Sequence, residues 1–330
     1  MRRAAALVIT PLLAGLALAG CGSSSSTSAS SKASGSSSAS AAATNAYQAV
    51  TVTGAFGKAP KVTIPKETGT GALLAKTLIQ GAGAKLTTAD GLVGNYVAYD
   101  WSGKTSKLLG SSYTSGSPSL FVGQLLPGLE TALIGQKLGS RVLAVIPPAD
   151  AFGTSGNSQE GIGAKDTLVF VIDLDSTFPT SSVPGAQSST SLGSSLPTVT
   201  PPKSGSTAGP TISVNTKATA PKALQVKTLI TGTGAKVKSG QDLAVQYTGV
   251  IWRTGKVFDS SWSRNQPFTT VIGEGQVIKG WDTGLVGQTV GSRVLLVIPP
   301  AEGYGTAGAS TAGITGSDTL VFVVDILAAV

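Results

Sequence analysis

The chain contains no histidine and a single cysteine, Cys21. A disulfide within the chain is therefore impossible, and zinc sites built from cysteine and histidine are excluded. A Ser–His–Asp triad and a Cys–His pair are excluded by the same absence. Any catalysis must rely on carboxylates, lysine or tyrosine, or must proceed without proton transfer.

Charge and aromatic residues are also scarce. Charged residues make up 12% and aromatic residues 5% of the 330 residues, whereas glycine is abundant at 43. A chain with so few charged and aromatic residues and so much glycine does not have the composition of one large, packed enzyme core. The net charge of +8 comes largely from tails and polar stretches, including Arg2, Arg3, Lys203 and Lys217. A nucleic-acid binder would gather its basic residues on one face of a folded unit, so no nucleic-acid binding is expected.

The N-terminus has the pattern of a signal peptide. Arg2 and Arg3 precede an apolar run that ends at Cys21. A membrane-spanning anchor is disfavoured, because Pro11 interrupts the run and it is shorter than the ~20 residues that a spanning helix needs. Residues 18–21, Leu-Ala-Gly-Cys, resemble the bacterial lipobox. This resemblance implies that residues 1–20 are removed and that lipidated Cys21 holds an extracytoplasmic lipoprotein on the outer face of the cell membrane.

An internal repeat organises the rest of the chain. Three pairs of segments match in order: 76–85 with 227–236, 138–148 with 290–300, and 167–174 with 319–326. We therefore predict two copies of one domain, at 47–175 and 221–330. Residues 21–46 are almost entirely Ser, Ala, Gly and Thr and are expected to form a disordered tether. The Ser/Thr/Pro-rich stretch 176–220 is interpreted as a linker.

The secondary structure is predicted to be mostly strand. Residues 292–299 and 319–327 are β-branched apolar runs, and residues 242–252 alternate between apolar and polar. One short helix is expected at about 276–285. These features predict an α+β fold in which each copy wraps an antiparallel sheet around a short α-helix.

A series of motifs in 221–330 resembles one known family. In chain order they are Tyr-Thr-Gly at 247–249, Gly-Lys-Val-Phe-Asp-Ser-Ser at 255–261, Arg-Asn-Gln-Pro-Phe at 264–268, Gln-Val-Ile-Lys-Gly-Trp at 276–281, Gly-Tyr-Gly at 303–305 and Thr-Leu-Val-Phe at 319–322. Together they resemble the FKBP-type, or tacrolimus-binding, peptidyl-prolyl cis–trans isomerases. The resemblance covers nearly all of the second copy and implies FKBP-like folds for both copies.

The resemblance implies an apolar pocket with Trp281 as its floor, beneath the proline ring of the substrate. Phe258 also falls at a pocket position, and the walls would be Tyr247, Phe268, Val277, Ile278 and Phe322. For any one of these side chains, ordinary core packing is the alternative. The flap segment 306–317 contributes Ile314 but lacks the histidine and proline residues usual in the family.

Polar groups complete the implied site. The resemblance gives Tyr304 a hydroxyl contact with a substrate carbonyl, and the backbone N–H of Ile278 a second contact. Asp259 would form the polar edge, held by Tyr247 and Arg264. The alternative for Asp259 and Arg264 is a surface ion pair that contributes less than ~1 kcal/mol.

The implied reaction is compatible with the absence of histidine. Rotation about an Xaa–Pro bond must overcome a barrier of ~18–20 kcal/mol because it breaks amide resonance. An apolar pocket favours the twisted transition state, in which the carbonyl oxygen carries less charge, and a few hydrogen bonds orient the chain. No proton is transferred, and neither a cofactor nor a metal is expected.

The first copy retains the framework and lacks much of the pocket. Tyr96, Phe152, Ile162 and Phe170 match Tyr247, Tyr304, Ile314 and Phe322, although Phe152 has no hydroxyl. At the other pocket positions the Phe-Asp pair becomes Leu109-Gly110, Arg264 aligns with Ser115, and Leu129 replaces the tryptophan floor. We predict little or no isomerase activity in this copy.

Two functions remain open. The first is an isomerase that acts on proline-containing unfolded or exported polypeptides, with the second copy catalytic and tacrolimus or rapamycin as a ligand. The second is a non-enzymatic binding or chaperone lipoprotein whose two FKBP-like domains hold partner chains.

Overall fold

The computed structural model describes residues 46–330 apart from 70, 124, 186–195 and 204–205. The predicted signal peptide, Cys21 and all of the tether except residue 46 lie outside the described residues. Within the described ranges, no helix has the length and apolar character needed to cross a lipid bilayer.

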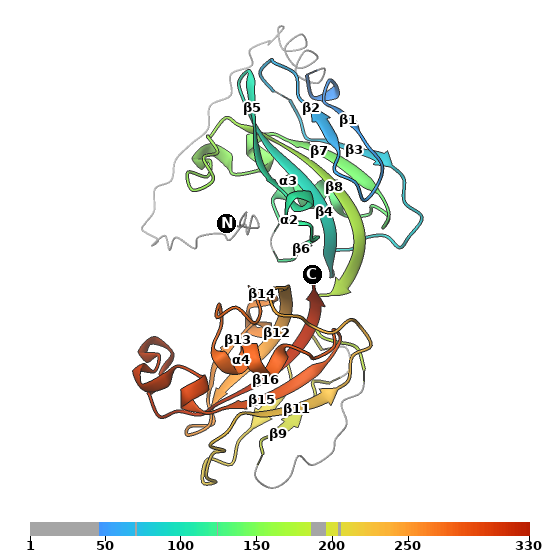
Figure 1. Ribbon diagram of the computed structural model, residues 1–330. Coiled ribbons are helices and arrows are strands. Elements are labelled where there is room, and N and C mark those ends of the chain that lie inside the picture. The colour runs from blue at the N-terminus through green and yellow to red at the C-terminus, as the bar shows by residue number, and fades with distance from the viewer. Residues whose placement is uncertain (1–45, 70, 124, 186–195, 204–205) are drawn as a thin grey trace, which may run out of the picture. The chain divides into compact units, whose positions relative to one another are not determined.

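Each copy contains one six-stranded sheet (Figure 1). In the first copy the strand order is β3-β7-β8-β4-β5, with β6 also paired to β4. The strands are β3 (Leu74–Ile79), β4 (Asp90–Ser102), β5 (Thr105–Ser111), β6 (Ser119–Phe121), β7 (Arg141–Ile146) and β8 (Thr167–Pro179). This copy includes the helices α2 (Ser112–Ser115) and α3 (Pro127–Leu133), followed by 3₁₀ turns at Pro148–Asp150 and Gly153–Ser155.

The second copy repeats this topology in the order β11-β15-β16-β12-β13, with β14 paired to β12. Its elements are β11 (Gln225–Ile230), β12 (Asp242–Ile251), β13 (Val257–Ser260), β14 (Phe268–Val271), α4 (Lys279–Leu285), β15 (Arg293–Ile298) and β16 (Leu320–Ala329), with 3₁₀ turns at Trp262–Arg264, Pro300–Glu302, Gly305–Ala307 and Ser310–Ala312. All described pairings in both sheets are antiparallel. The predicted α+β class and the three predicted strand segments are confirmed.

The sheet of the second copy buries both of its faces. Because side chains alternate along a strand, β16 sends residues to two different cores. Leu320, Phe322, Val324 and Ile326 join the inner core on the side of α4, whereas Val321 and Val323 join an outer core. The continuous apolar run at 319–327 therefore reflects a strand that is covered on both sides.

A small hairpin covers the outer face. Strands β9 (Thr198–Thr200) and β10 (Thr211–Ser213) pair with each other and place Val199 and Ile212 against Trp252. The indole N–H of Trp252 donates to the carbonyl of Ala218 at 3.1 Å. The stretch interpreted as a linker, 176–220, thus contains the end of β8 and a folded hairpin.

The first copy has a corresponding hairpin on the outer face of its sheet. Strands β1 (Thr51–Thr53) and β2 (Lys61–Thr63) pair, and Val52 and Val62 pack beside Trp101 in the outer core. The Trp101 indole N–H donates to the carbonyl of Glu67 at 2.8 Å. The repeated unit therefore includes the hairpin that precedes each sheet.

Helix α4 is shorter than expected and begins at Lys279 rather than near 276. Ile278 is extended (φ −58°, ψ 143°) and forms its N-cap. Gly280 lets the helix lie close to β15, because a Cβ at this position would be 2.6 Å from a methyl group of Ile298. This close packing carries Trp281 onto the inner face of the sheet.

Candidate active site in the second repeat

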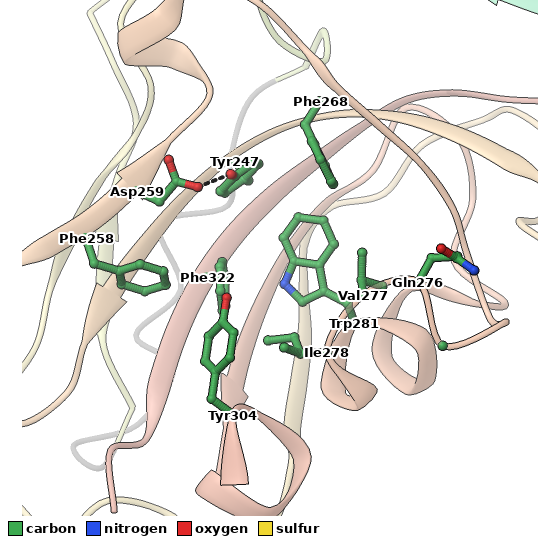
Figure 2. A pocket seen from close by; sticks show the side chains of 11 residues that line it. Tyr247, Phe258, Asp259, Phe268, Gln276, Val277, Ile278, Trp281, Tyr304 and Phe322 are labelled. Atoms are coloured by element: carbon green, nitrogen blue, oxygen red, sulfur yellow. Dashed lines mark hydrogen bonds between the residues drawn. The ribbon is translucent and has the colours of Figure 1, made fainter. Parts of the chain in front are cut away.

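A cavity of about 440 Å³ opens beside α4 in the second copy. Figure 2 shows Trp281 among aromatic side chains from several elements: Tyr247 from β12, Phe258 from β13, Phe268 from β14 and Phe322 from β16. The complete lining is Tyr247, Phe258, Asp259, Phe268, Gly275, Gln276, Val277, Ile278, Trp281, Tyr304 and Phe322. The cavity wall is therefore mostly apolar, with a few polar groups.

Edge-to-face contacts fix the aromatic rings. The ring centroid of Trp281 lies 5.2 Å from Tyr247, 5.4 Å from Phe322 and 6.2 Å from Phe268, with interplanar angles of 84°, 85° and 79°. Phe258 meets Phe322 in the same way at 5.5 Å. Such pairs are favoured over face-to-face stacks, and they hold a ring in one orientation. The face of Trp281 consequently forms a flat apolar surface at the base of the cavity.

The main polar edge of the cavity is a charged cluster centred on Asp259. Tyr247 donates its hydroxyl hydrogen to Asp259 (Figure 2). Arg264 pairs with the same carboxylate. Arg264 also donates to the Tyr247 hydroxyl oxygen at 3.1 Å. Burial, followed by the hydrogen bond to Asp259, raises the pKa of Tyr247 to about 12. Tyr247 therefore remains a protonated donor near neutral pH.

Tyr304 and Ile278 border the cavity in the way that the resemblance implies. The Tyr304 side chain is 41% exposed, and Figure 2 shows its hydroxyl end inside the site. Burial, with a smaller contribution from Asp259, raises the pKa of Tyr304, so its hydroxyl is a donor as well. The N–H of Ile278 precedes the first turn of α4, where backbone amides have no partner within the helix.

The loop before α4 is held by Asp282 from the first turn of that helix. Its carboxylate accepts hydrogen bonds from the N–H groups of Gly273 and Gly275 at 2.6 and 2.8 Å. Both glycines have a positive φ, of 80° and 75°. The loop places Gly275, Gln276 and Val277 along one side of the cavity.

The structure brings nearly all of the expected site residues together. Arg264 does not line the cavity, but it contacts Asp259 and Tyr247. Ile314 is absent from the lining, although, like Trp281 and Phe322, it is 4% exposed and belongs to the inner core. Its backbone forms an antiparallel bridge with Ala309 within the flap segment. Gly275 and Gln276 line the cavity although the sequence interpretation gave them no role, and the motif at 276–281 contained the signal for Gln276.

The first copy has lost the polar edge at the same place. In β4–β5, Ala98 pairs with Gly110, just as Gly249 pairs with Asp259 in β12–β13. A Cβ at Gly110 would lie 3.0 Å from the Tyr96 hydroxyl. Leu129, at the position of Trp281, is 1% exposed in α3. Gly110 therefore occupies the position of the acid, and the tyrosine hydroxyl lies directly above it.

A protein-family profile and several known proteins match this chain. A family profile described as FKBP-type peptidyl-prolyl cis-trans isomerase matches residues 90–175 and 233–327. The chain is 52% identical to FK506-binding protein 2B of Rhizopus delemar over 28% of this chain and 44% of that protein. It is 43% identical to an FK506-binding protein of Streptomyces anulatus over 33% of this chain and 87% of that protein. Thus it spans under half of the fungal protein's length and most of the Streptomyces protein's length.

A longer match, over 209 residues, exceeds the length of either copy. Peptidyl-prolyl cis-trans isomerase FKBP9 of Rattus norvegicus is 32% identical over 62% of this chain and 29% of that protein. Among solved structures, AtFKBP13 shares 34% identity over 34% of this chain and 96% of that chain, with a TM-score of 0.31. The family profile covers more than half of the described chain, once in each copy. The chain therefore belongs to the FKBP-type peptidyl-prolyl cis–trans isomerase family.

Proposed function

We propose that this protein accelerates cis–trans isomerisation of Xaa–Pro bonds and that the cavity of the second copy is the active site. The observation that carries this proposal is the combination of Trp281 as an apolar base with Asp259 and Tyr304 at the rim. The names of the Streptomyces and rat relatives, an FK506-binding protein and an isomerase, support it.

The chemistry requires binding and orientation only. A proline ring lies on Trp281, and the aromatic walls exclude water from the bond that rotates. Rotation removes amide conjugation and reduces the charge on the carbonyl oxygen, so the apolar cavity stabilises the twisted state relative to water. The Tyr304 hydroxyl and the Ile278 N–H bind substrate carbonyls and orient the chain. No side chain gains or loses a proton during this step.

The first copy is proposed to be non-catalytic. Gly110 provides no carboxylate, Phe152 no hydroxyl and Leu129 no indole surface. The FKBP-like sheet of this copy is intact, so it can hold a polypeptide without catalysing rotation. Tacrolimus or rapamycin is likewise proposed to bind in the second copy only. These ligands would occupy the place of the proline ring, and the first copy has Leu129 instead of the tryptophan beneath that place.

The substrates are proposed to be exported, proline-containing polypeptides outside the cytoplasm. The support is the sequence of residues 1–21, in which Arg2, Arg3 and an apolar run precede Cys21. Lipidation of Cys21 with two acyl chains would give stable attachment to the membrane. Replacement of Cys21 by alanine is expected to release the protein from membrane fractions, and retention in the membrane would refute this anchor.

The activity is tested by one matched pair of substitutions in the full chain. Tyr247→Phe removes the hydroxyl that donates to Asp259, and Tyr96→Phe removes the corresponding hydroxyl in the first copy. In a proline-limited refolding assay, we expect Tyr247→Phe to lower the rate enhancement about three- to tenfold, as loss of one hydrogen bond implies. Tyr96→Phe should match the wild type. Wild-type protein without any rate enhancement would refute the isomerase and favour the non-enzymatic binding protein.

A further inference from the structure

A short segment upstream of the second sheet is hydrogen-bonded to residues that neighbour the candidate active site in the chain. Residues 180–183 follow β8 and lie in the stretch that the sequence indicates as a linker. They belong to the same compact unit as the second copy, since residues 174–330 cluster together. Three polar groups of the second copy bind this segment.

The three contacts involve its backbone. Gln246 donates from Nε2 to the carbonyl of Thr180 at 2.8 Å. Trp262 donates from its indole N–H to the carbonyl of Ser181 at 2.6 Å. The N–H of Val183 donates to Asp325 at 3.0 Å. Because the partners are backbone atoms, the sequence of the segment carries no signal for these contacts.

Gln246 connects this segment with the site through Ser261. The Ser261 hydroxyl donates to the Gln246 side-chain carbonyl and accepts the N–H of Tyr247 at 2.8 Å. The backbone N–H of Ser261 donates to the Tyr247 carbonyl at 3.0 Å. Gln246 is 2% and Ser261 0% exposed, so this chain of hydrogen bonds is shielded from water. It ends two residues after Asp259.

Trp262 makes a second connection. It starts the 3₁₀ turn Trp262–Arg264, whose last residue pairs with Asp259. Its ring also lies against Gly209, where a Cβ would be only 2.5 Å from the ring atoms. The indole is 5% exposed and is held both by this backbone and by the Ser181 carbonyl. The 3₁₀ turn that carries Arg264 is therefore held in place by the contacts of Trp262 with Ser181 and Gly209.

The first copy provides an internal comparison. Its Ser112 hydroxyl donates to Asn95 and accepts the N–H of Tyr96, each at 2.9 Å. The hydrogen bonds of Ser261 with Gln246 and Tyr247 therefore have counterparts in the first copy. At the position of Trp262, however, Tyr113 of α2 donates to Asp173 of β8 in its own copy at 2.8 Å. The copy that lacks the Asp259 carboxylate thus also lacks a tryptophan anchored to an upstream carbonyl at this position.

We propose that Gln246 and Trp262 are positioning residues that fix residues 259–264 through the segment 180–183. They do not touch the substrate. They hold the loop so that Asp259 stays within reach of Tyr247 and Arg264. This inference rests on the proposed isomerase function of the same site, and it means that the catalytic domain includes part of the stretch between the two repeats.

The test compares two tryptophans in the full-length protein. Trp262→Phe removes the donor to Ser181 and retains an aromatic ring. Trp252→Phe is the matched control, because Trp252 is equally buried and its indole also donates to a backbone carbonyl of this stretch, yet it lies on the outer face of the sheet. Hydrogen exchange of the amides of Arg264, Asn265 and Gln266 is measured together with kcat/KM.

Trp262→Phe is expected to speed exchange at the three amides and to lower kcat/KM, each about three- to tenfold, as loss of one hydrogen bond implies. Trp252→Phe should leave the exchange rates of these amides and kcat/KM unchanged. In an Asp259→Leu background the effect of Trp262→Phe on the residual kcat/KM should disappear, because the positioned group is gone.

The inference is overturned if Trp262→Phe and Trp252→Phe give the same exchange rates. It is also overturned if the loss in kcat/KM persists at full size in the Asp259→Leu background, since that would indicate a general effect on the fold. Wild-type protein without turnover would refute the proposed function instead, and the exchange rates alone would then decide whether the loop is anchored in this way.

Discussion

Replacing Trp281 by leucine, the residue that the first copy has at this position, removes the base of the cavity. Trp281 is 4% exposed and makes edge-to-face contacts with Tyr247, Phe268 and Phe322. Each aromatic contact contributes ~0.5–1.5 kcal/mol beyond the buried area. The smaller side chain buries roughly 70 Å² less apolar surface, which corresponds to ~2 kcal/mol.

One structural detail lowers the destabilisation expected from these contributions. The indole nitrogen of Trp281 is buried, and within the part of the chain that the structure describes it has no hydrogen-bond partner. Removing an unpaired buried donor recovers ~1 kcal/mol or more. Taking the three aromatic contacts and the buried area together and subtracting the recovered donor, the expected destabilisation of the second domain by Trp281→Leu is about 2.5–5.5 kcal/mol.

The kcat/KM of Trp281→Leu should fall by more than its loss of stability accounts for. A proline ring that loses a flat aromatic surface loses a large part of its buried contact, so kcat/KM is expected to drop about 10- to 100-fold, or ~1.4–2.7 kcal/mol. The assay is proline-limited refolding at low temperature, with circular dichroism to confirm that the protein is folded. Trp252→Leu is the control, because it removes an equally buried tryptophan from the outer face. A folded Trp281→Leu variant with activity within about twofold of the wild type would refute this reasoning.

Three further predictions concern single polar groups. Tyr304→Phe keeps the ring and removes a partly exposed hydroxyl, so kcat/KM should fall about three- to tenfold with no change in Tm; an unchanged kcat/KM would contradict the proposed carbonyl contact. Asp259→Asn removes the carboxylate whose hydrogen bond with the Tyr247 hydroxyl, after burial, raises the pKa of Tyr247 to about 12, so ultraviolet titration should show a lower midpoint for this tyrosine; an equal or higher midpoint would contradict the assigned cause. Asp100 is buried in the first copy, and burial with the nearby charge of Asp166 raises its pKa from 3.8 to about 6. The folded state thus binds this proton more tightly than the unfolded state, and the stabilisation of the first copy, up to ~3 kcal/mol, should be present below about pH 4 and lost as the pH rises to about 6. Calorimetry of Asp100→Ile, which introduces the residue found at this position in the second copy, should show one unfolding transition whose Tm no longer falls over this range; a Tm that still falls equally would contradict the assignment.

The strands could be predicted because their signals are local, and the cavity because the motifs resemble those of a known family. The apolar runs at 292–299 and 319–327 and the alternation at 242–252 match β15, β16 and β12 within a few residues. The aromatic and acidic side chains of the motifs converge because the topology places β12, β13, β14 and α4 around one face. The resemblance implied this convergence, which periodicity alone could not.

The stretch 176–220 shows what the sequence could not reveal. Its strands β9 and β10 have three residues each, and each contributes one buried side chain, Val199 or Ile212. Such short elements show no measurable alternation. The roles of Trp252 and Trp262 were missed as well, because both donate to backbone carbonyls. Ile314 was expected at the cavity, yet it is absent from the lining and its side chain belongs to the inner core.

The central claim is that turnover resides in the second copy. It is tested most directly by measuring isomerisation of an Xaa–Pro peptide with full-length protein that carries both Asp259→Leu and Trp281→Leu, beside the wild type. The account predicts enhancement by the wild type and a rate indistinguishable from the uncatalysed reaction for the folded double variant. A double variant that retains wild-type activity would place catalysis elsewhere in the chain and contradict the account.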